Sequence, residues 1–313
     1  MKMTDRNKPR GEAAATAALL PRQTVDEAIG VLLAYHQGEL VMGLRAALDR
    51  PMPETIQALR AALRRLRAAL ALSAGWCDEN ALDEILRDAQ ALFDALGETR
   101  QWDALIAGPL TRHVDELAGV ADVAVLTEAA AAARHEGYRR VHVLLDGPLP
   151  QRLLLGLALL VSQQRWRGGA NALSRRLAGS VRARAKRDIA RLDKRARDRG
   201  KSLRRLSGEK RQDLAGDVRQ LAEALELLAP LWHRTARTRR YRQRVQALQA
   251  ALDGLQAAET ALRLLDRIAE DDPSPVVQRA VGAIGGWSVR DRADRLAGLE
   301  KLWREFRSTK RFW

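Results

Sequence analysis

Apolar residues recur along this chain at the spacing of helix faces. Between residues 25 and 47 they include Ile29, Leu32, Leu33, Leu40 and Leu44, which follow the three-and-four-residue spacing of an amphipathic helix. The prolines at positions 51 and 53 end this element and open the next one. Alternating runs rich in Val and Ile, typical of strands, are nearly absent. The pattern therefore predicts an all-α protein.

The next predicted helix, residues 53–75, carries two different faces. Its apolar stripe consists of Ile56, Leu59, Leu63, Leu66 and Leu70. The row beside this stripe consists of Gln57, Arg60, Arg64 and Arg67. A single arginine on a helix is usually a solvated surface residue, but arginines one turn apart repel each other. The row therefore indicates either a multivalent anion as ligand or acidic neighbours that neutralise it.

Further helices are predicted over residues 81–95, 121–143 and 153–161, followed by a long basic helix over residues 171–199. On the basic helix the spacing of the first row recurs in Arg184, Arg187, Arg191 and Lys194. Ser207 marks the start of the helix after it. Because the second half repeats the plan of the first, we predict a flexible tail over residues 1–24, a first helical bundle over residues 25–150 and a second over residues 151–313.

The charge of the chain is concentrated in one block. Residues 151–211 hold 19 Lys and Arg against four Asp and Glu, an excess that equals the net charge of +15. Such concentration favours a polyanionic partner. The single cysteine, Cys77, excludes an internal disulfide and is typical of a reducing compartment. We find no uncharged apolar run of the length that spans a membrane, so we predict a cytoplasmic protein with no membrane partner.

The helix of residues 53–75 also carries a family resemblance. Written as Ile-Gln-x-Leu-Arg-x-x-x-Arg-Arg-Leu-Arg-x-x-Leu, residues 56–70 resemble the first signature helix of the CHAD family, the conserved histidine alpha-helical domain. Gln57 stands where that family carries its name-giving histidine. Residues 96–103, Leu-Gly-Glu-Thr-Arg-Gln-Trp-Asp, are similar to a second family element. Taken by themselves, Arg100 and Asp103 in this element are expected to form a local cap or ion pair.

The second signature of the family falls on residues 212–226, where this sequence departs furthest from it. The matching positions are Leu214, Arg219, Leu221 and Glu226. The departures replace the second histidine, two arginines and a tyrosine, in that order, with Gln212, Ala215, Ala222 and Glu223. Residues 248–256 and 302–313 are similar to later elements of the family, so the resemblance extends from about residue 25 to residue 313.

The resemblance implies two pseudo-symmetric four-helix bundles with a basic groove or pore between them, and binding of inorganic polyphosphate. Short loops between amphipathic helices favour bundles independently. A linear anion with one charge per phosphate matches arginines one turn apart, because each guanidinium can bind two oxygens. The expected polyphosphate-binding residues are Arg60, Arg64, Arg67, Arg184, Arg187, Arg191, Lys194 and Arg219. Association with polyphosphate granules would fit this function.

We predict no enzyme activity, no catalytic residue, no metal and no cofactor. Cleavage of a phosphoanhydride would call for clustered carboxylates that hold a metal, and both cationic rows are poor in carboxylates along the sequence. Because Gln57 and Gln212, unlike histidine, cannot gain a charge, we expect the affinity for polyphosphate to change little between pH 8 and pH 6. Oligomeric state is left open by the sequence.

Two other functions stay open at this stage. The basic block could bind nucleic acid, although its only candidate stacking aromatic is Trp166 and no helix-turn-helix or zinc pattern accompanies it. Alternatively, the departures at the second signature allow a protein-interaction or scaffold module that has lost its ligand site. A concave basic surface would favour polyphosphate, whereas a flat or convex one would favour duplex nucleic acid.

Overall fold

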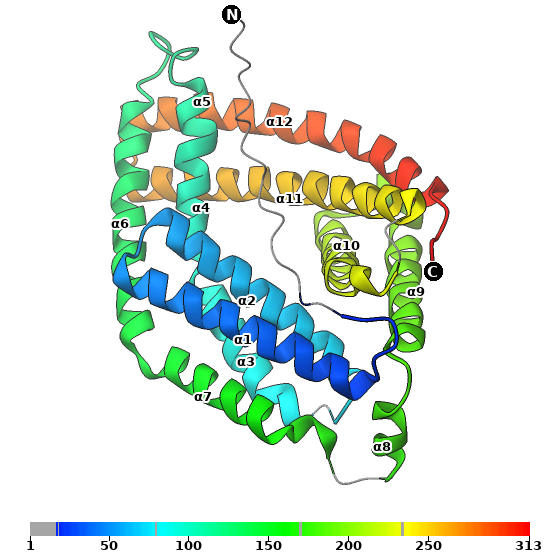
Figure 1. Ribbon diagram of the computed structural model, residues 1–313. Coiled ribbons are helices and arrows are strands. Elements are labelled where there is room, and N and C mark those ends of the chain that lie inside the picture. Colours follow the sequence, from blue (N-terminus) through cyan, green and yellow to red (C-terminus); the bar gives the residue numbers. More distant parts are fainter. Residues whose placement is uncertain (1–16, 18, 79, 169–170, 233–234) are drawn as a thin grey trace, which may run out of the picture.

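The computed structural model describes residues 17, 19–78, 80–168, 171–232 and 235–313, so most of the predicted tail lies outside the described residues. Within these ranges no strand occurs, which confirms the all-α class (Figure 1). The α-helices are α1 (Val25–Asp49), α2 (Pro53–Ala74), α3 (Asn80–Ala95), α4 (Gly97–Leu105), α5 (Thr111–His113), α6 (Ala124–Asp146), α7 (Pro148–Gln163), α8 (Asn171–Leu177), α9 (Val181–Arg199), α10 (Gly208–Leu228), α11 (Ala236–Asp271) and α12 (Pro275–Ser308). The π-helical turn η1 (Ile106–Leu110) and the 3₁₀ turns η2 (Arg165–Arg167), η3 (Gly200–Arg205) and η4 (Ala229–Leu231) lie between them.

Local sequence sets the ends of the helices that matter for function. Pro53 occupies the first turn of α2, where its missing N–H costs nothing, and Gly75 ends that helix at the predicted position. The basic stretch 171–199, predicted as one helix, is two helices. The prediction was wrong because Ser180 has an extended backbone and its hydroxyl accepts a hydrogen bond from the Ala183 N–H, which makes it the N-cap of α9.

The hydrophobic core does not divide at residue 150. Helix α7, which the sequence assigned to the second bundle, packs against α1 and α3, and its Leu153 and Leu157 join a core that also includes residues of α9, α10 and α11. A second cluster joins Trp102 and Leu126 to Leu265 of α11. Helix α11 has 36 residues, so it extends beyond its own half of the chain and contacts α4 and α6.

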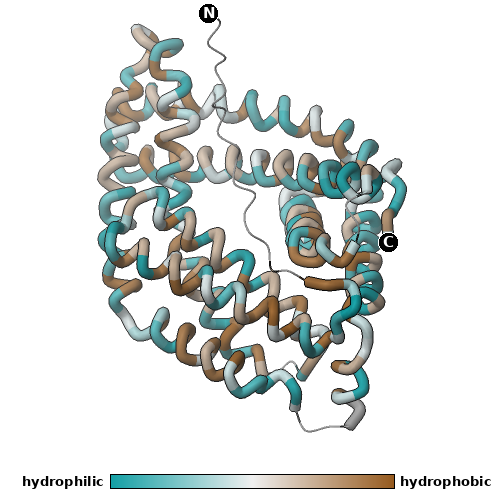
Figure 2. Tube along the Cα trace, viewed as in Figure 1, coloured by the Kyte–Doolittle hydropathy of each residue, from teal (hydrophilic) through white to brown (hydrophobic). Residues whose placement is uncertain are grey.

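Helix α10 lies between the elements that carry the predicted cations. It packs against α2, α9 and α11, and Figure 1 shows it end-on among them. Backbone hydrogen bonds fix the start of α9 beside the start of α1: the Val25 N–H donates to the Gly179 carbonyl at 2.9 Å, and the Val181 N–H donates to the Gln23 carbonyl at 3.1 Å. Hydrophilic residues are prominent along α9 (Figure 2). The basic helix is thus held at the side of the fold with much of its surface toward solvent.

The segment after α12 folds back onto α9. Arg311 lies 2.8 Å from the carboxylate of Asp193, which is fully buried. The same carboxylate accepts hydrogen bonds from the Tyr241 hydroxyl at 2.6 Å and from the Arg197 Nε at 2.7 Å. At the end of α9, a Cβ on Gly200 would overlap the ring of Trp303. Buried polar groups and close packing therefore fix the C-terminal segment against α9.

Within the described part of the chain, no individual helix combines the length and the apolar character that a membrane span needs. Helices α6 and α7 meet both criteria when they are taken together, and they are bent by 46° relative to each other.

Candidate functional site

The two faces predicted for α2 are present in the fold. Its apolar stripe is buried, with Ile56 at 2% exposure and Leu59, Leu63, Leu66 and Leu70 at 0%. The three arginines beside the stripe, which we call the α2 row, are Arg60, Arg64 and Arg67, and each is partly buried. Gln57 is exposed on the same side. The α2 row therefore lies at the edge of the core and not on a fully solvated face.

Two arginines of the α2 row lie against one aromatic ring. The guanidinium carbons of Arg60 and Arg67 are 4.2 Å and 4.5 Å from the centre of the Phe93 ring. Arg60 also donates a hydrogen bond to the Phe93 carbonyl at 2.7 Å. Burial, followed by repulsion from Arg100, lowers the pKa of Arg60 to about 10, so the group stays charged at neutral pH. The buried Nε of Arg67 has no hydrogen-bond partner among the described residues, which leaves a donor open.

Two carboxylates of α10 face the middle of the α2 row. The Nη1 atom of Arg64 lies 3.8 Å from an oxygen of Glu223 and 3.8 Å from an oxygen of Glu226. Burial raises the pKa of Glu223 to about 7, against the opposite effect of Arg64, Arg219 and Arg67. The expectation that both rows are poor in carboxylates is therefore wrong for α2, because packing of α10 brings in two acids that are distant in sequence.

Arg219 links α10 to α11. Its Nη2 atom lies 2.6 Å from the carboxylate of Asp253 and 3.4 Å from the side-chain oxygen of Gln256. Arg219 also influences the pKa values of Arg67 and Glu223 through its charge. The structure thus brings this predicted residue to the α2 row, although one carboxylate already holds it.

The four predicted cations of α9, which we call the α9 row, are Arg184, Arg187, Arg191 and Lys194. Two of them pair with the buried carboxylate of Asp188. Arg184 and Arg191 lie 3.1 Å and 3.4 Å from its oxygens, and the indole N–H of Trp76 donates to it at 2.6 Å. Arg184 also donates to the carbonyl of Gly75 at 2.5 Å, the residue that ends α2. Gly75 follows the α2 row on the same helix face, so the α9 row begins at the end of that face. At 1.5 Å per residue, Gly75 lies about 22 Å along the helix from Arg60.

The other two predicted cations of α9 form no ion pair with any residue that the structure describes. Arg187 and Lys194 are exposed and have no carboxylate partner among the described residues. The Arg191 side chain is 70% exposed although it pairs with Asp188. Together with Arg184 they follow a slanted stripe along α9, so the row runs from the α2 contact toward solvent.

An open pocket of about 450 Å³ lies along α9. This α9 pocket is lined by Arg191, Lys194, Arg195, Asp198 and Arg199. Sequence reasoning missed Arg195 and Arg199, although their spacing from Arg191 on one helix could have indicated them. Asp217 of α10 lies 2.7 Å from Arg195 and 2.6 Å from Arg199, which fixes both guanidinium groups at the pocket wall. The pocket lies along a single helix and is open to solvent, and its lining holds four cations and one acid, Asp198.

Other candidate residues have structural surroundings. Asp103, expected to pair with Arg100, instead lies 2.7 Å from Arg134 and accepts a hydrogen bond from the Tyr138 hydroxyl at 2.9 Å. Cys77 is buried, and burial raises the pKa of its thiol to about 12, so it stays a neutral thiol. Across the described residues, no group of three or more His, Cys, Asp or Glu is arranged to hold a metal ion.

The comparisons with known proteins agree with this architecture. The fold is similar to the crystal structure of the CHAD domain from the plant Ricinus communis, with a TM-score of 0.76 and 23% identity over 96% of this chain and 98% of that chain. It is also similar to PptA from Streptomyces chartreusis, with a TM-score of 0.68 and 15% identity over 90% of this chain and 100% of that chain. A comparison with curated proteins gives no match. The family model of the CHAD domain matches residues 32–266, which is well over half of the sequence, and the chain belongs to the CHAD domain family.

Proposed function

We propose that this protein binds inorganic polyphosphate without catalysis, and that the ligand contacts the α9 pocket and then the α2 row. The observation that carries the proposal is the lining of the α9 pocket, which gathers four cations, Arg191, Lys194, Arg195 and Arg199, on one face of α9. Two of these cations, Arg195 and Arg199, are oriented in advance by Asp217. A preformed cationic wall reduces the entropy lost on binding and releases counterions from the polyanion.

The α2 row would extend the contact surface. Arg184 at Gly75 connects the α9 row to this helix face. A phosphate oxygen that approaches Arg64 must compete with Glu223 and Glu226, which already lie near it. The carboxylates that surround the cations are themselves held by arginines, as Asp188 and Asp217 are, so they support a neutralising role better than a catalytic one.

Nucleic acid is the weaker candidate. The aromatic residue of the basic block, Trp166, is 1% exposed, and its indole N–H donates to Asp26 at 2.8 Å. It therefore offers no ring for base stacking.

The test of the proposal compares two polyanions. Full-length protein would be titrated with long-chain polyphosphate and with duplex DNA at equal phosphate concentration, at about 50 mM and about 200 mM salt. We expect polyphosphate to bind more tightly than DNA and to keep this advantage at the higher salt concentration. Equal binding to both polyanions that disappears at the higher salt would indicate a diffuse positive surface and would contradict the proposal.

A buried carboxylate near the α2 row, Glu223, leads us to expect more pH dependence of binding than Gln57 and Gln212 by themselves predict. Because the pKa of Glu223 is about 7, this carboxylate is mostly ionised at pH 8 and mostly protonated at pH 6. The ionised Glu223 carboxylate neutralises Arg64 and Arg67 and repels phosphate. Binding of polyphosphate is therefore favoured when Glu223 takes up a proton. We expect the affinity for polyphosphate to rise by up to about tenfold when the pH falls from 8 to 6, measured by calorimetric titration.

Two variants on α10 distinguish titration of Glu223 from the simple loss of a negative charge. Glu223→Gln should bind more tightly at pH 8 and lose the pH dependence that the Glu223 carboxylate causes. Glu226→Gln removes the same charge from the same helix and should also bind more tightly at pH 8, but it should keep the pH dependence, because Glu223 still titrates. A pH profile that is identical in the wild type and in Glu223→Gln would show that this carboxylate is not the titrating group.

A further inference from the structure

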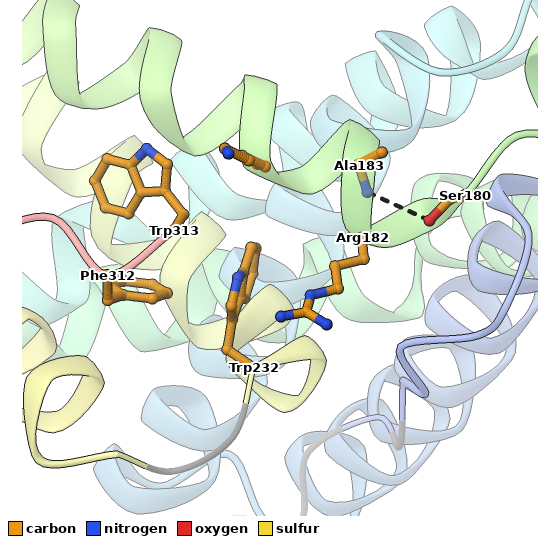
Figure 3. A pocket seen from close by; sticks show the side chains of 7 residues that line it. Ser180, Arg182, Ala183, Trp232, Phe312 and Trp313 are labelled. Carbon is orange, nitrogen blue, oxygen red and sulfur yellow. Dashed lines mark hydrogen bonds between the residues drawn. The ribbon is translucent and has the colours of Figure 1, made fainter.

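A second pocket, of about 360 Å³, lies where the C-terminal segment meets the start of α9 (Figure 3). We call it the aromatic pocket. Its apolar wall consists of Trp232, Phe312 and Trp313, and its cations are Arg182 and Lys186 of α9. Figure 3 shows the three rings gathered on one side, with Arg182 extending toward Trp232. This pocket shares no residue with the α9 pocket or the α2 row.

The aromatic wall is held in place by its own packing. The Phe312 ring meets Trp232 edge-on at 5.3 Å between centroids and Trp313 edge-on at 5.0 Å. The buried ring of Tyr241 packs edge-on against both Phe312 and Trp313, at 5.6 Å and 5.0 Å between centroids. The ion pair between Arg311 and Asp193 fixes the segment that carries these rings. The wall is therefore formed before any ligand arrives, which lowers the entropic cost of stacking a flat molecule there.

The two cations of the pocket form no ion pair within the described part of the chain. Arg182 and Lys186 lie one turn apart on α9, both are exposed, and neither forms an ion pair with a described residue. Like charges at this spacing repel each other, and the first turn of α9 contains no acid that would offset them. A bound anion would relieve that repulsion.

We propose that the aromatic pocket binds a nucleoside phosphate, with the base against the partly exposed rings of Phe312 and Trp313 beside the largely buried Trp232, and with the phosphate at Arg182 and Lys186. The aromatic wall can stack against any base, and the two cations bind the phosphate. The volume of the pocket falls in the range of small-molecule sites. The proposal does not depend on polyphosphate binding, because it concerns different residues and requires the base as well as the phosphate.

The test uses ligands that differ in one part each. Full-length protein that carries Arg187→Gln, Arg191→Gln and Lys194→Gln, which weaken the α9 pocket, would be titrated calorimetrically with ATP, tripolyphosphate and adenosine. We expect ATP to bind at least tenfold more tightly than either of the other two, because it alone engages both the rings and the cations. Binding of tripolyphosphate as tight as that of ATP would overturn the proposal.

Two variants in the same background assign the site. Trp232→Leu should weaken ATP binding at least tenfold and leave tripolyphosphate binding unchanged. The double variant Arg182→Gln with Lys186→Gln should weaken ATP binding by a similar factor. Both positions are exposed, so this variant should stay folded and still test the site if Trp232→Leu destabilises the protein. ATP binding that is unchanged in the double variant would overturn the proposal, whatever polyphosphate does in its own assay.

Discussion

Replacing Arg187, Arg191 and Lys194 with glutamine is expected to weaken the binding of long-chain polyphosphate by about 100-fold. These three cations of α9 are exposed, and Arg187 and Lys194 have no ion pair with any described residue, so their charges are available to a ligand. Glutamine is shorter than arginine and lysine but stays polar, and it removes the charge that displaces counterions. Calorimetric titration would measure the affinity, and the salt dependence should become less steep in the variant.

The matched control removes the same number of charges elsewhere. Arg45, Arg112 and Arg279 lie on other helices, are exposed and form no ion pair within the described ranges. Their triple replacement with glutamine should change the affinity for polyphosphate by less than about threefold, because long-range charge is screened beyond about 10 Å at 0.1 M salt. Equal losses in the two triple variants would show that only net charge matters and would contradict a site on α9.

Asp193→Ala is expected to lower the free energy of unfolding by about 3–5 kcal/mol. The Asp193 carboxylate is 0% exposed and holds Arg197, Arg311 and the Tyr241 hydroxyl. Its removal leaves a largely buried guanidinium and a buried hydroxyl without their acceptor, and it releases the segment that carries Phe312 and Trp313. Guanidinium chloride denaturation, followed by far-UV circular dichroism, would measure the effect.

A neighbouring aspartate on the same helix serves as the control. Asp198 is exposed and pairs only with the surface residue Lys201, at 2.7 Å, among the ion pairs of the described residues. Asp198→Ala should therefore leave the denaturation midpoint unchanged within error. A midpoint shift as large in Asp198→Ala as in Asp193→Ala would mean that loss of helix propensity or net charge, and not the buried network, causes the destabilisation.

Much of the fold could be predicted from local patterns. The buried stripe of Ile56, Leu59 and Leu63 follows directly from 3.6-residue periodicity, and the ends of α2 at Pro53 and Gly75 follow from helix-end preferences. One local feature was missed: Ser180 splits the basic stretch, and its N-cap signal was available in the sequence. Local rules succeed here because each residue acts on neighbours within a turn or two.

The candidate site could be predicted only in part. The α2 and α9 rows were evident as spacings, yet which of their cations stay available depends on distant carboxylates. Glu223 and Glu226 reach Arg64 because α10 packs on α2. The aromatic pocket likewise joins Arg182 to Trp232 and Trp313. Asp188, by contrast, lies within four residues of Arg184 and Arg191 on the same helix and could have been found from its spacing.

The sequence by itself determined that this protein is helical, that it concentrates positive charge in one block, and that arginines are set one turn apart on particular helix faces. Tertiary structure decided which of these charges are neutralised and which remain free, as Arg64 and Arg187 illustrate. The physical reason is the distance along the chain over which each property is set. Helical periodicity is fixed by neighbours in the chain, whereas the charge and pKa of a side chain are set by whichever groups packing places within a few ångströms, wherever they lie in the sequence.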